Sequence, residues 1–365
     1  MGVRRLTNLR GQPVSFGSEK ARRRVDKPRG DGRGPRAPTA SGWRHVNAPP
    51  VYSFLVHSFL LALFLGLPGE RAQPTFTLAL VGDVMLGRGV AQALDGEWGA
   101  AFAEVQPWLA GADLAFANLE SPLTTAPQVK DGYDLRAPPD AVAALQAGGF
   151  DVVSVANNHT FDAGQAGARE TLNTLCVADI APVVDWETGR LGDWESGRLV
   201  DGGRFPMYQS TSKPTYQVLA FDDSAGPMDV AVAVRAVAAA AERADVLIVS
   251  VHWGGEYQAA PSPRQRAIAA KLAAAGADLI VGHGPHVLQR AAWVEGTLVA
   301  YSLGNFLFDQ PYPVDCRWGA ILRVTLRGDR IVAVEALPTT VERGRVRPAD
   351  PKTGAAILAR LNLQP

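Results

Sequence analysis

Imidazole and carboxylate side chains stand at the ends of several short apolar runs in this chain. The imidazoles are His159, His252, His283 and His286. The carboxylates are Asp83 and Glu120, and no cysteine belongs to the set. Mixed nitrogen and oxygen donors suit zinc, manganese or iron. The residue types therefore favour a site for divalent ions, against the alternative that the histidines are scattered through an ordinary core.

Two features of this set point to hydrolytic chemistry. A carboxylate shared by two cations would let the pair activate a water molecule and stabilise the leaving oxygen. His283 and His286 flank Gly284 and Pro285, so one short turn could supply two ligands. His159 directly follows Asn158 and could stand beside the metal ions as an acid rather than as a ligand.

The elements that must position these residues alternate between strands and helices, which predicts an α/β fold. Apolar runs flanked by glycine predict buried strands at 76–81, 113–117, 151–156, 245–251, 278–281 and 297–302. Alanine- and leucine-rich stretches predict helices at 140–148, 164–175, 229–243 and 263–275, the last with Ser262 as N-cap. After Trp318 the pattern changes, and 320–326 and 331–337 predict an antiparallel hairpin. Because ligands bind beyond the carboxyl ends of parallel strands, the six polar residues are expected at one edge.

The chain has 365 residues, of which 47% are hydrophobic, with 36 basic and 36 acidic residues. Its length fits one large domain or two medium ones, and its apolar fraction is that of a globular protein, which excludes collagen-like, coiled-coil and multi-span membrane proteins. Residues 1–50 hold 12 basic and 3 acidic side chains, which leaves 24 basic and 33 acidic ones for the rest. We interpret 1–50 as a disordered basic tail. The alternatives are that this segment is an arm that binds nucleic acid or anionic lipid, or that the translation start is misassigned. The acidic remainder predicts no nucleic-acid partner.

Residues 51–67 form an uncharged apolar run that is followed by Pro68 and Gly69. The run predicts that 51–72 is a signal peptide or a membrane anchor, so that the protein is exported and extracytoplasmic, either anchored or secreted. A buried core helix is the alternative. Cys176 and Cys316 could pair in an oxidising compartment or stay buried and unpaired.

The segment 73–345 is expected to be the functional domain, and 346–365 a C-terminal tail. Within the domain, residues 185–192 are nearly repeated in 193–200. The unit is too short for a solenoid, so we expect a surface loop insertion, with a lid that faces the ligand as the alternative.

Six motifs, in this order, resemble those of the CapA family. They are GDVMLGR (82–88), ANLESPL (117–123), ANNH (156–159), HWGGEY (252–257), GHGPHV (282–287) and YSLGNF (301–306). The resemblance covers about 76–308. It implies a role in poly-γ-glutamate capsule biosynthesis. It also implies a fold like that of the calcineurin-like metallophosphoesterases, a two-sheet α/β sandwich flanked by helices with two metals at its edge.

The resemblance also implies a role for individual residues. Asp83 would be the first metal ligand, Glu120 the bridging acid and Asn158 the amide ligand. The remaining ligands would be His252, His283 and His286, with His159 as the catalytic imidazole. Arg88, Glu256 and Asn305 would bind substrate; the first two could instead be solvated loop charges, and Asn305 a turn residue. The chain departs from the phosphoesterase pattern at Met85, where those enzymes carry a histidine, and this departure leaves one metal position weak or absent.

We therefore expect a CapA-family protein that is a divalent-metal-dependent, hydrolase-like protein of anionic cell-surface polymer biosynthesis. Its cofactors would be one or two ions of manganese, zinc or iron. Its partners would be an anionic polymer or phosphoester substrate and the membrane-bound subunits of a polymer synthase. The alternatives are a non-catalytic accessory subunit of a polymer synthase or exporter, and a metal-dependent phosphatase or phosphodiesterase.

Overall fold

The computed structural model describes residues 4–5, 75–185 and 215–363. The apolar run 51–67, all but two residues of the basic tail, and all of the near-repeat except Asp185 lie outside the described residues. Among the described helices, none has both the length and the apolar character needed to cross a bilayer.

The first of two β-sheets has a parallel half and an antiparallel half. Its parallel strands are β2 (Thr75–Val84), β3 (Leu114–Leu119), β4 (Val152–Ser154) and β5 (Ala181–Val183), with β11 (Asn305–Leu307) parallel to the end of β2. Its antiparallel strands are β12 (Trp318–Arg327), β13 (Arg330–Glu342), β14 (Arg345–Pro348) and β1 (Arg4–Arg5). β2 joins the halves, because it pairs with β3 on one side and with β12 on the other.

The second sheet has the order β6-β7-β8-β10-β9. Its strands are β6 (Tyr216–Asp222), β7 (Val246–His252), β8 (Leu279–His283), β10 (Thr297–Ala300) and β9 (Ala291–Val294). The first four are parallel, and β9 returns antiparallel to β10.

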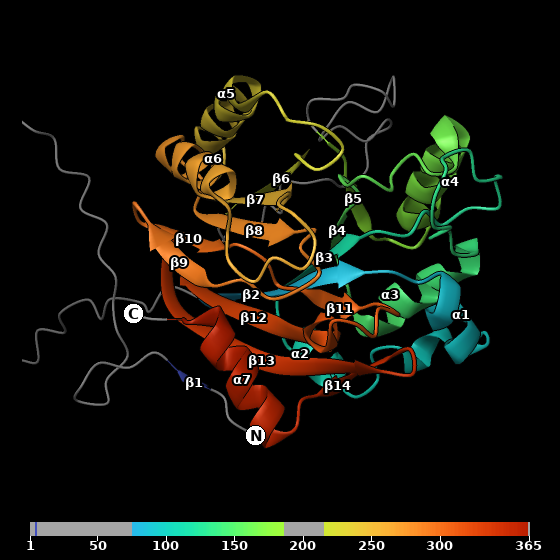
Figure 1. Cartoon of the computed structure of the whole chain (residues 1–365). Helices are drawn as coiled ribbons and strands as arrows, with labels where there is room; N and C mark the ends of the chain where they lie inside the picture. Colours follow the sequence, from blue (N-terminus) through green and yellow to red (C-terminus); the bar gives the residue numbers. More distant parts are fainter. Residues whose placement is uncertain (1–3, 6–74, 186–214, 364–365) are drawn as a thin grey trace, which may run out of the picture. The chain divides into compact units, whose positions relative to one another are not determined.

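Helices cover both sheets (Figure 1). Those beside the first sheet are α1 (Arg88–Leu94), α2 (Gln106–Leu109), α3 (Val142–Gly148) and α4 (Gly164–Val177), with 3-10 turns at Trp98–Ala100 and Pro139–Ala141. The second sheet carries α5 (Val230–Ala241) and α6 (Pro263–Ala274). The 3-10 turn Val314–Arg317 precedes β12, and α7 (Pro351–Leu361) packs on β13 and β12.

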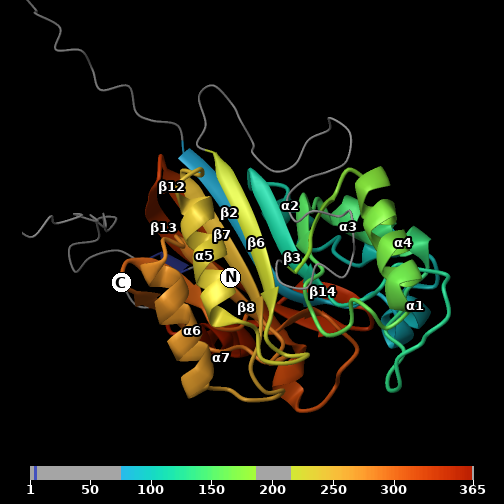
Figure 2. The same cartoon turned by 90° about the horizontal axis from the view of Figure 1, so that it is seen from above.

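Three apolar cores hold these layers together, and strand alternation assigns side chains to them. On β2, Leu78 and Leu80 enter the core between the sheets, whereas Ala79 and Val81 face the helices of the first sheet. On β7, Ile248 joins the core between the sheets, and the outer core packs under α5 and α6. In Figure 2, β2, β3 and β6 run in nearly the same direction, as in an aligned two-sheet sandwich.

The structure confirms the predicted α/β fold, the two sheets and the C-terminal hairpin. Ser262 caps α6 in a capping box with Gln265, which satisfies backbone N–H groups at the start of the helix. The predicted strand and helix boundaries agree to within three residues, except that β13 ends at Glu342, five residues beyond the predicted 337. Residues 346–365, which the sequence analysis assigned to a C-terminal tail, include most of β14 and all of α7.

Candidate metal centre

Strand register brings the donors of each sheet side by side. In the first sheet, Asp83 on β2 lies opposite Asn118 on β3 and Asn305 on β11. In the second sheet, His252 on β7 lies opposite His283 on β8. Asp83, Asn118, His252 and His283 lie at the carboxyl ends of their strands, which is the edge the sequence predicted, and Asn305 begins β11 beside the end of β2.

The two sheets face each other across this edge, so donors far apart in the chain meet. Asp83 Oδ1 lies 3.3 Å from His283 Nδ1, and Asp83 Oδ2 lies 3.4 Å from His286 Nδ1. Glu120 Oε1 is 3.4 Å from His252 Nδ1, and Glu120 Oε2 is 3.9 Å from His286 Nε2. The structure therefore gathers five of the expected metal-site residues into one buried cluster.

Asn118 is a central residue that the sequence analysis did not select. Its Nδ2 donates to Asp83 Oδ1 at 2.9 Å and to Glu120 Oε1 at 3.4 Å. Its Oδ1 accepts a hydrogen bond from Asn157 Nδ2 at 3.1 Å. Asn118 is fully buried and orients both carboxylates. Strand alternation could have indicated it, because it lies two residues before Glu120 on the same face.

The cluster contains unpaired groups that fit a cation. Glu120 Oε2 and both ring nitrogens of His283 are buried without a hydrogen-bond partner among the described residues. Three residues, Asp83, Glu120 and His286, each present a donor atom within 4.8 Å of the other two. Buried polar atoms are almost always satisfied, and carboxylate with imidazole is a suitable donor set for a divalent ion. The residues present therefore fit a metal ion.

Electrostatics lead to the same conclusion. Burial would raise the pKa of Asp83, but the close approach of the His283 and His286 rings lowers it below its usual value. Burial, followed by the charge of Asp83, raises the pKa of Glu120 well above its usual value. Burial lowers the pKa of His252 to about 3. Two carboxylates cannot both be ionised at low cost in this buried space, so a cation would relieve a real electrostatic penalty.

Asn305 fixes the orientation of the His286 ring. The ring Nδ1 donates to Asn305 Oδ1 at 2.9 Å, which leaves Nε2 to face Glu120. Burial opposes protonation of this ring, but the charge of Glu120 and the hydrogen bond to Asp83 raise its pKa to about 10. Asn305 is itself fully buried, and its Nδ2 donates to Gln310 Oε1 and to the Cys316 carbonyl, each at 3.0 Å.

His159 lies beside this cluster rather than within it. Its Nδ1 is 2.7 Å from Asp162 Oδ2, and its Nε2 is 3.1 Å from Asn158 Nδ2. Lys130 Nζ lies 3.3 Å from Asp162 Oδ1 and donates to the Asn158 carbonyl at 2.6 Å. The Asn158 side chain thus contacts the histidine, and Asn157 is the neighbour that bonds to Asn118.

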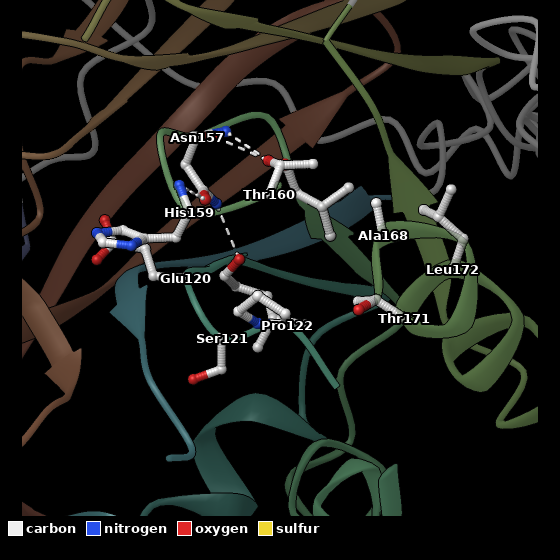
Figure 3. Close-up of a pocket in the computed structure, with 11 residues that line it drawn as sticks. Glu120, Ser121, Pro122, Asn157, His159, Thr160, Ala168, Thr171 and Leu172 are labelled. Atoms are coloured by element: carbon white, nitrogen blue, oxygen red, sulfur yellow. Dashed lines mark hydrogen bonds between the residues drawn. The ribbon is translucent and has the colours of Figure 1, made fainter. Parts of the chain in front are cut away.

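A small cavity lies between the end of β3 and helix α4. Its volume is about 10 Å³, enough for one water molecule, and Figure 3 shows His159 and Glu120 at one end of it. Ser121, Asn157 and Thr171 also line it, so its wall is partly polar. The cavity is too small to hold a substrate.

The other residues discussed in the sequence analysis lie outside the buried cluster. The Arg88 guanidinium pairs with Asp309, and Glu256 is exposed on the loop after β7, where its charge adds to the rise in the pKa of Glu120. Met85 is fully buried in the apolar core, and its sulfur accepts from the Gly87 N–H at 3.1 Å. Cys176 and Cys316 are both free, so the structure shows no disulfide between them.

A comparison with known families fits this arrangement. The sequence profile of the bacterial capsule synthesis protein family PGA_cap matches residues 77–183 and 200–310. This chain belongs to the PGA_cap family. The profile leaves 184–199 unmatched, which is nearly all of the near-repeat that we interpret as an insertion.

The chain is similar to proteins named for the biosynthesis of a capsule, of PGA or of polyglutamine. It is 31% identical to the capsule biosynthesis protein CapA of Bacillus anthracis, over 76% of this chain and 71% of that protein. It is 29% identical to the PGA biosynthesis protein CapA of Bacillus subtilis, over 82% and 81%. A probable polyglutamine synthesis accessory protein of Mycobacterium tuberculosis is 27% identical, over 75% and 87%. A solved structure of a hypothetical protein from Thermus thermophilus superposes with a TM-score of 0.46 at 19% identity, over 73% of this chain and all of that chain.

Proposed function

We propose that this chain acts in the biosynthesis of poly-γ-glutamate or a closely related anionic polymer of the cell surface, as a divalent-metal-dependent, hydrolase-like protein. The observation that carries the proposal is the buried cluster of Asp83, Glu120 and His286, with its unpaired donor atoms. The names of the Bacillus relatives support the choice of polymer.

Within this proposal, the residues of the cluster divide into metal ligands and residues that orient those ligands. Asp83, Glu120, His252, His283 and His286 hold one or two divalent ions, while Asn118 and Asn305 orient them. A bound ion would lower the pKa of a water molecule and polarise the bond to be cleaved. Asp83 is the residue most tightly fixed, because it accepts hydrogen bonds from Asn118 and from the Gly284 N–H at 3.3 Å.

His159 is the proposed general acid. Asp162 fixes the ring through Nδ1, so Nε2 is the atom that can deliver a proton to a leaving oxygen or nitrogen. The His159 side chain is 19% exposed, whereas that of Asp162 is 2% exposed. This difference suits a group that touches substrate and is supported by a buried partner.

A non-catalytic accessory role, with polymer synthase subunits as partners, is the second candidate. Two observations favour it: the naming of the M. tuberculosis relative as an accessory protein, and the burial of Met85 within the apolar core. In either role we propose that the protein is exported, on the basis of the apolar run 51–67 in the sequence.

The test combines metal content with turnover in the full chain. Purified wild type, Asp83→Ala and His159→Ala are given a linear γ-glutamyl oligomer and, separately, a chromogenic phosphodiester. The proposal predicts metal-dependent cleavage of the oligomer that Asp83→Ala loses together with the metal and His159→Ala loses without losing the metal. Cleavage of the phosphodiester alone would establish a phosphoesterase instead. Bound metal without turnover of either probe would establish the accessory role, and a chain without metal overturns the proposal.

A further inference from the structure

Large exposed hydrophobic side chains gather on the loops that leave the donor strands. Six such side chains occur among the described residues, and all except Val177 on α4 lie in the loops after β3, β7 and β11. The five are Val129, Tyr133, Tyr257, Tyr312 and Val314. These strands also position Glu120, His252 and Asn305. Exposed apolar groups concentrated around a polar site mark a surface that contacts a ligand.

Arg88 is held rigidly beside one of these tyrosines. Its Nε donates to Asp309 Oδ2 at 3.1 Å, and its Nη2 lies 2.8 Å from Asp309 Oδ1. The guanidinium carbon lies 5.1 Å from the centre of the Tyr133 ring. Asp309 also accepts from the Gly89 N–H at 2.9 Å, so one carboxylate fixes both the backbone and the side chain here. Nη1 has no partner among the described residues, and the Arg88 side chain is 28% exposed, so this group can meet a ligand.

Tyr257 is connected to the metal cluster by a short hydrogen-bond chain. Gln310 Nε2 donates to the Tyr257 hydroxyl at 3.4 Å, and Gln310 Oε1 accepts from Asn305 at 3.0 Å. Asn305 in turn holds His286. The backbone N–H of Tyr257 donates to the Pro285 carbonyl at 2.8 Å, inside the turn that carries both histidines. Asp309 and Gln310 are neighbours in the chain, so a single segment supports Arg88 on one side and Tyr257 on the other.

Three of the eight non-glycine residues with a positive φ among the described residues lie at this site. Arg88, Tyr257 and His286 have φ values of 48°, 62° and 58°, in the left-handed region that side chains with a Cβ rarely adopt. Such conformations persist where the surrounding structure enforces them, and they cluster at functional sites. Here two of the three belong to the surface beside the cluster and the third to the cluster itself.

We propose that Arg88, Tyr133 and Tyr257 form a subsite that holds an anionic segment of a linear polymer next to the metal centre, with a carboxylate on the guanidinium and methylene groups on the two rings. This inference rests on the proposed function and adds the chemistry that selects the substrate.

The chemistry of the subsite matches a γ-linked glutamyl chain. A planar guanidinium binds carboxylate with directed hydrogen bonds, and pairing with Asp309 removes the entropy cost of ordering it. A γ-linked glutamyl unit carries one free carboxylate and two methylene groups, which are apolar surface for an aromatic ring. Because the exposed side chains come from three loops, the surface suits an extended chain rather than a compact metabolite.

The test measures equilibrium binding of a fluorescently labelled linear γ-glutamyl oligomer to the full chain. All proteins carry His159→Ala, so that the probe is not consumed. Arg88→Gln is expected to weaken binding about tenfold or more, since a charge-assisted hydrogen bond is lost. Tyr133→Ala is expected to weaken it about threefold to fivefold. Tyr133 is 78% exposed, so its ring can be removed without loss of core packing.

Two matched controls keep the result specific. Arg347→Gln removes another ion-paired arginine, whose Nε lies 3.0 Å from Glu104 Oε1, and Val177→Ala removes an exposed apolar group on α4. Both should bind the oligomer as the parent protein does. An oligomer with every carboxylate amidated should bind the parent about tenfold more weakly and be insensitive to Arg88→Gln.

The outcomes separate the subsite from the proposed function. Unchanged affinity in both Arg88→Gln and Tyr133→Ala overturns the subsite, and so does a glycerol-phosphate oligomer that binds more tightly than the glutamyl one. No binding by the parent protein overturns the subsite and the choice of polymer together. Metal content and turnover, measured on matched preparations that lack His159→Ala, test the proposed function independently of this result.

Discussion

Asp83 and Glu120 show how the cluster depends on residues that bear no charge. Both carboxylates are buried, and Asn118 donates to each of them while accepting from Asn157. This amide fixes the separation and rotation of the two acids. Residues that orient metal ligands affect metal affinity almost as much as the ligands do.

Asn118→Leu should therefore lower metal affinity about tenfold to a hundredfold while leaving the fold intact, because leucine has a similar volume but cannot donate. The measurement is a titration of the metal-free protein with zinc or manganese. Asn173→Leu on the exposed side of α4 is the matched control. Equal affinity in Asn118→Leu and the control would contradict the orienting role.

The sequence predicted the cluster more completely than it predicted the supporting amides. Asp83, Glu120, His252, His283 and His286 could be selected because each follows a recognisable apolar run. Asn118 was missed because asparagine at a strand end is equally typical of a turn. Which of Asn157 and Asn158 faces inward depends on the backbone path after β4, and the residue types do not encode that path.

At the scale of secondary-structure elements, the donor strands are held in place where their backbones come close to neighbouring segments at glycine residues. A Cβ added to Gly82 would lie 1.9 Å from the Gly304 carbonyl oxygen, and one added to Gly282 would lie 2.0 Å from the Tyr301 carbonyl oxygen. Gly82 immediately precedes Asp83, and Gly304 immediately precedes Asn305. Glycine is thus required where β2 and β11 meet.

Gly82→Ala should separate β2 from β11, displace Asp83 and cost at least about 1–3 kcal/mol in stability. Thermal unfolding and metal content would both report it. Gly226→Ala is the control, since a Cβ there meets nothing within 4 Å. If Gly82→Ala retained the melting temperature and metal content of the wild type, the close approach would not matter.

Helix α4 secures the loop after β3 through Glu170. This carboxylate accepts from the Thr124 hydroxyl, from the Thr125 N–H at 3.0 Å and from the Thr125 hydroxyl at 3.1 Å. The Thr124 hydroxyl is the main reason that the pKa of Glu170 lies below its usual 4.5. A carboxylate with a lowered folded-state pKa contributes stability that is present above its unfolded pKa.

That contribution should disappear as the pH falls through the lowered pKa. Glu170→Gln is expected to be less stable than the wild type at neutral pH, and the difference should shrink as the pH falls below 4.5 and through the lowered pKa of Glu170. Thermal unfolding of both proteins across this range measures it. A difference that stays constant with pH would show that the ionised carboxylate is not what secures the loop.

The sequence predicted most of the larger elements but not how they pair. Apolar runs flanked by glycine marked β2, β3, β7 and β8, and Ser262 marked the start of α6. The three-residue strand β11 was missed because its only parallel partner is the end of β2, which is distant in the chain. Local pattern does not specify such a pairing.

At the scale of the whole molecule, two sheets share one core and present their parallel carboxyl ends to the same space. The division into two sheets follows from the resemblance to a family and not from the strand pattern, which indicates which residues are strands but not which strands are neighbours. The site therefore exists only when both sheets are packed together. Metal binding and folding should be linked for the same reason.

Removing metal should lower the melting temperature of the full chain. At a free metal concentration a hundred times the Kd, binding adds about 2.7 kcal/mol of stability. For a domain of this size that corresponds to roughly 5 °C. Calorimetry with and without a chelator measures the shift, and Asp83→Ala should not respond. An equal response in wild type and Asp83→Ala would place the effect elsewhere.

The most direct test of the account is the number of divalent ions bound per full chain, measured by elemental analysis. Wild type should hold one or two ions. Asp83→Asn should hold far fewer, while Asp151→Asn should match the wild type, because Asp151 precedes β4 at the opposite end of the sheet and its side chain accepts a hydrogen bond from the Ala115 N–H at 2.8 Å. Equal metal content in wild type and Asp83→Asn, or none in the wild type, would contradict a metal centre built on Asp83.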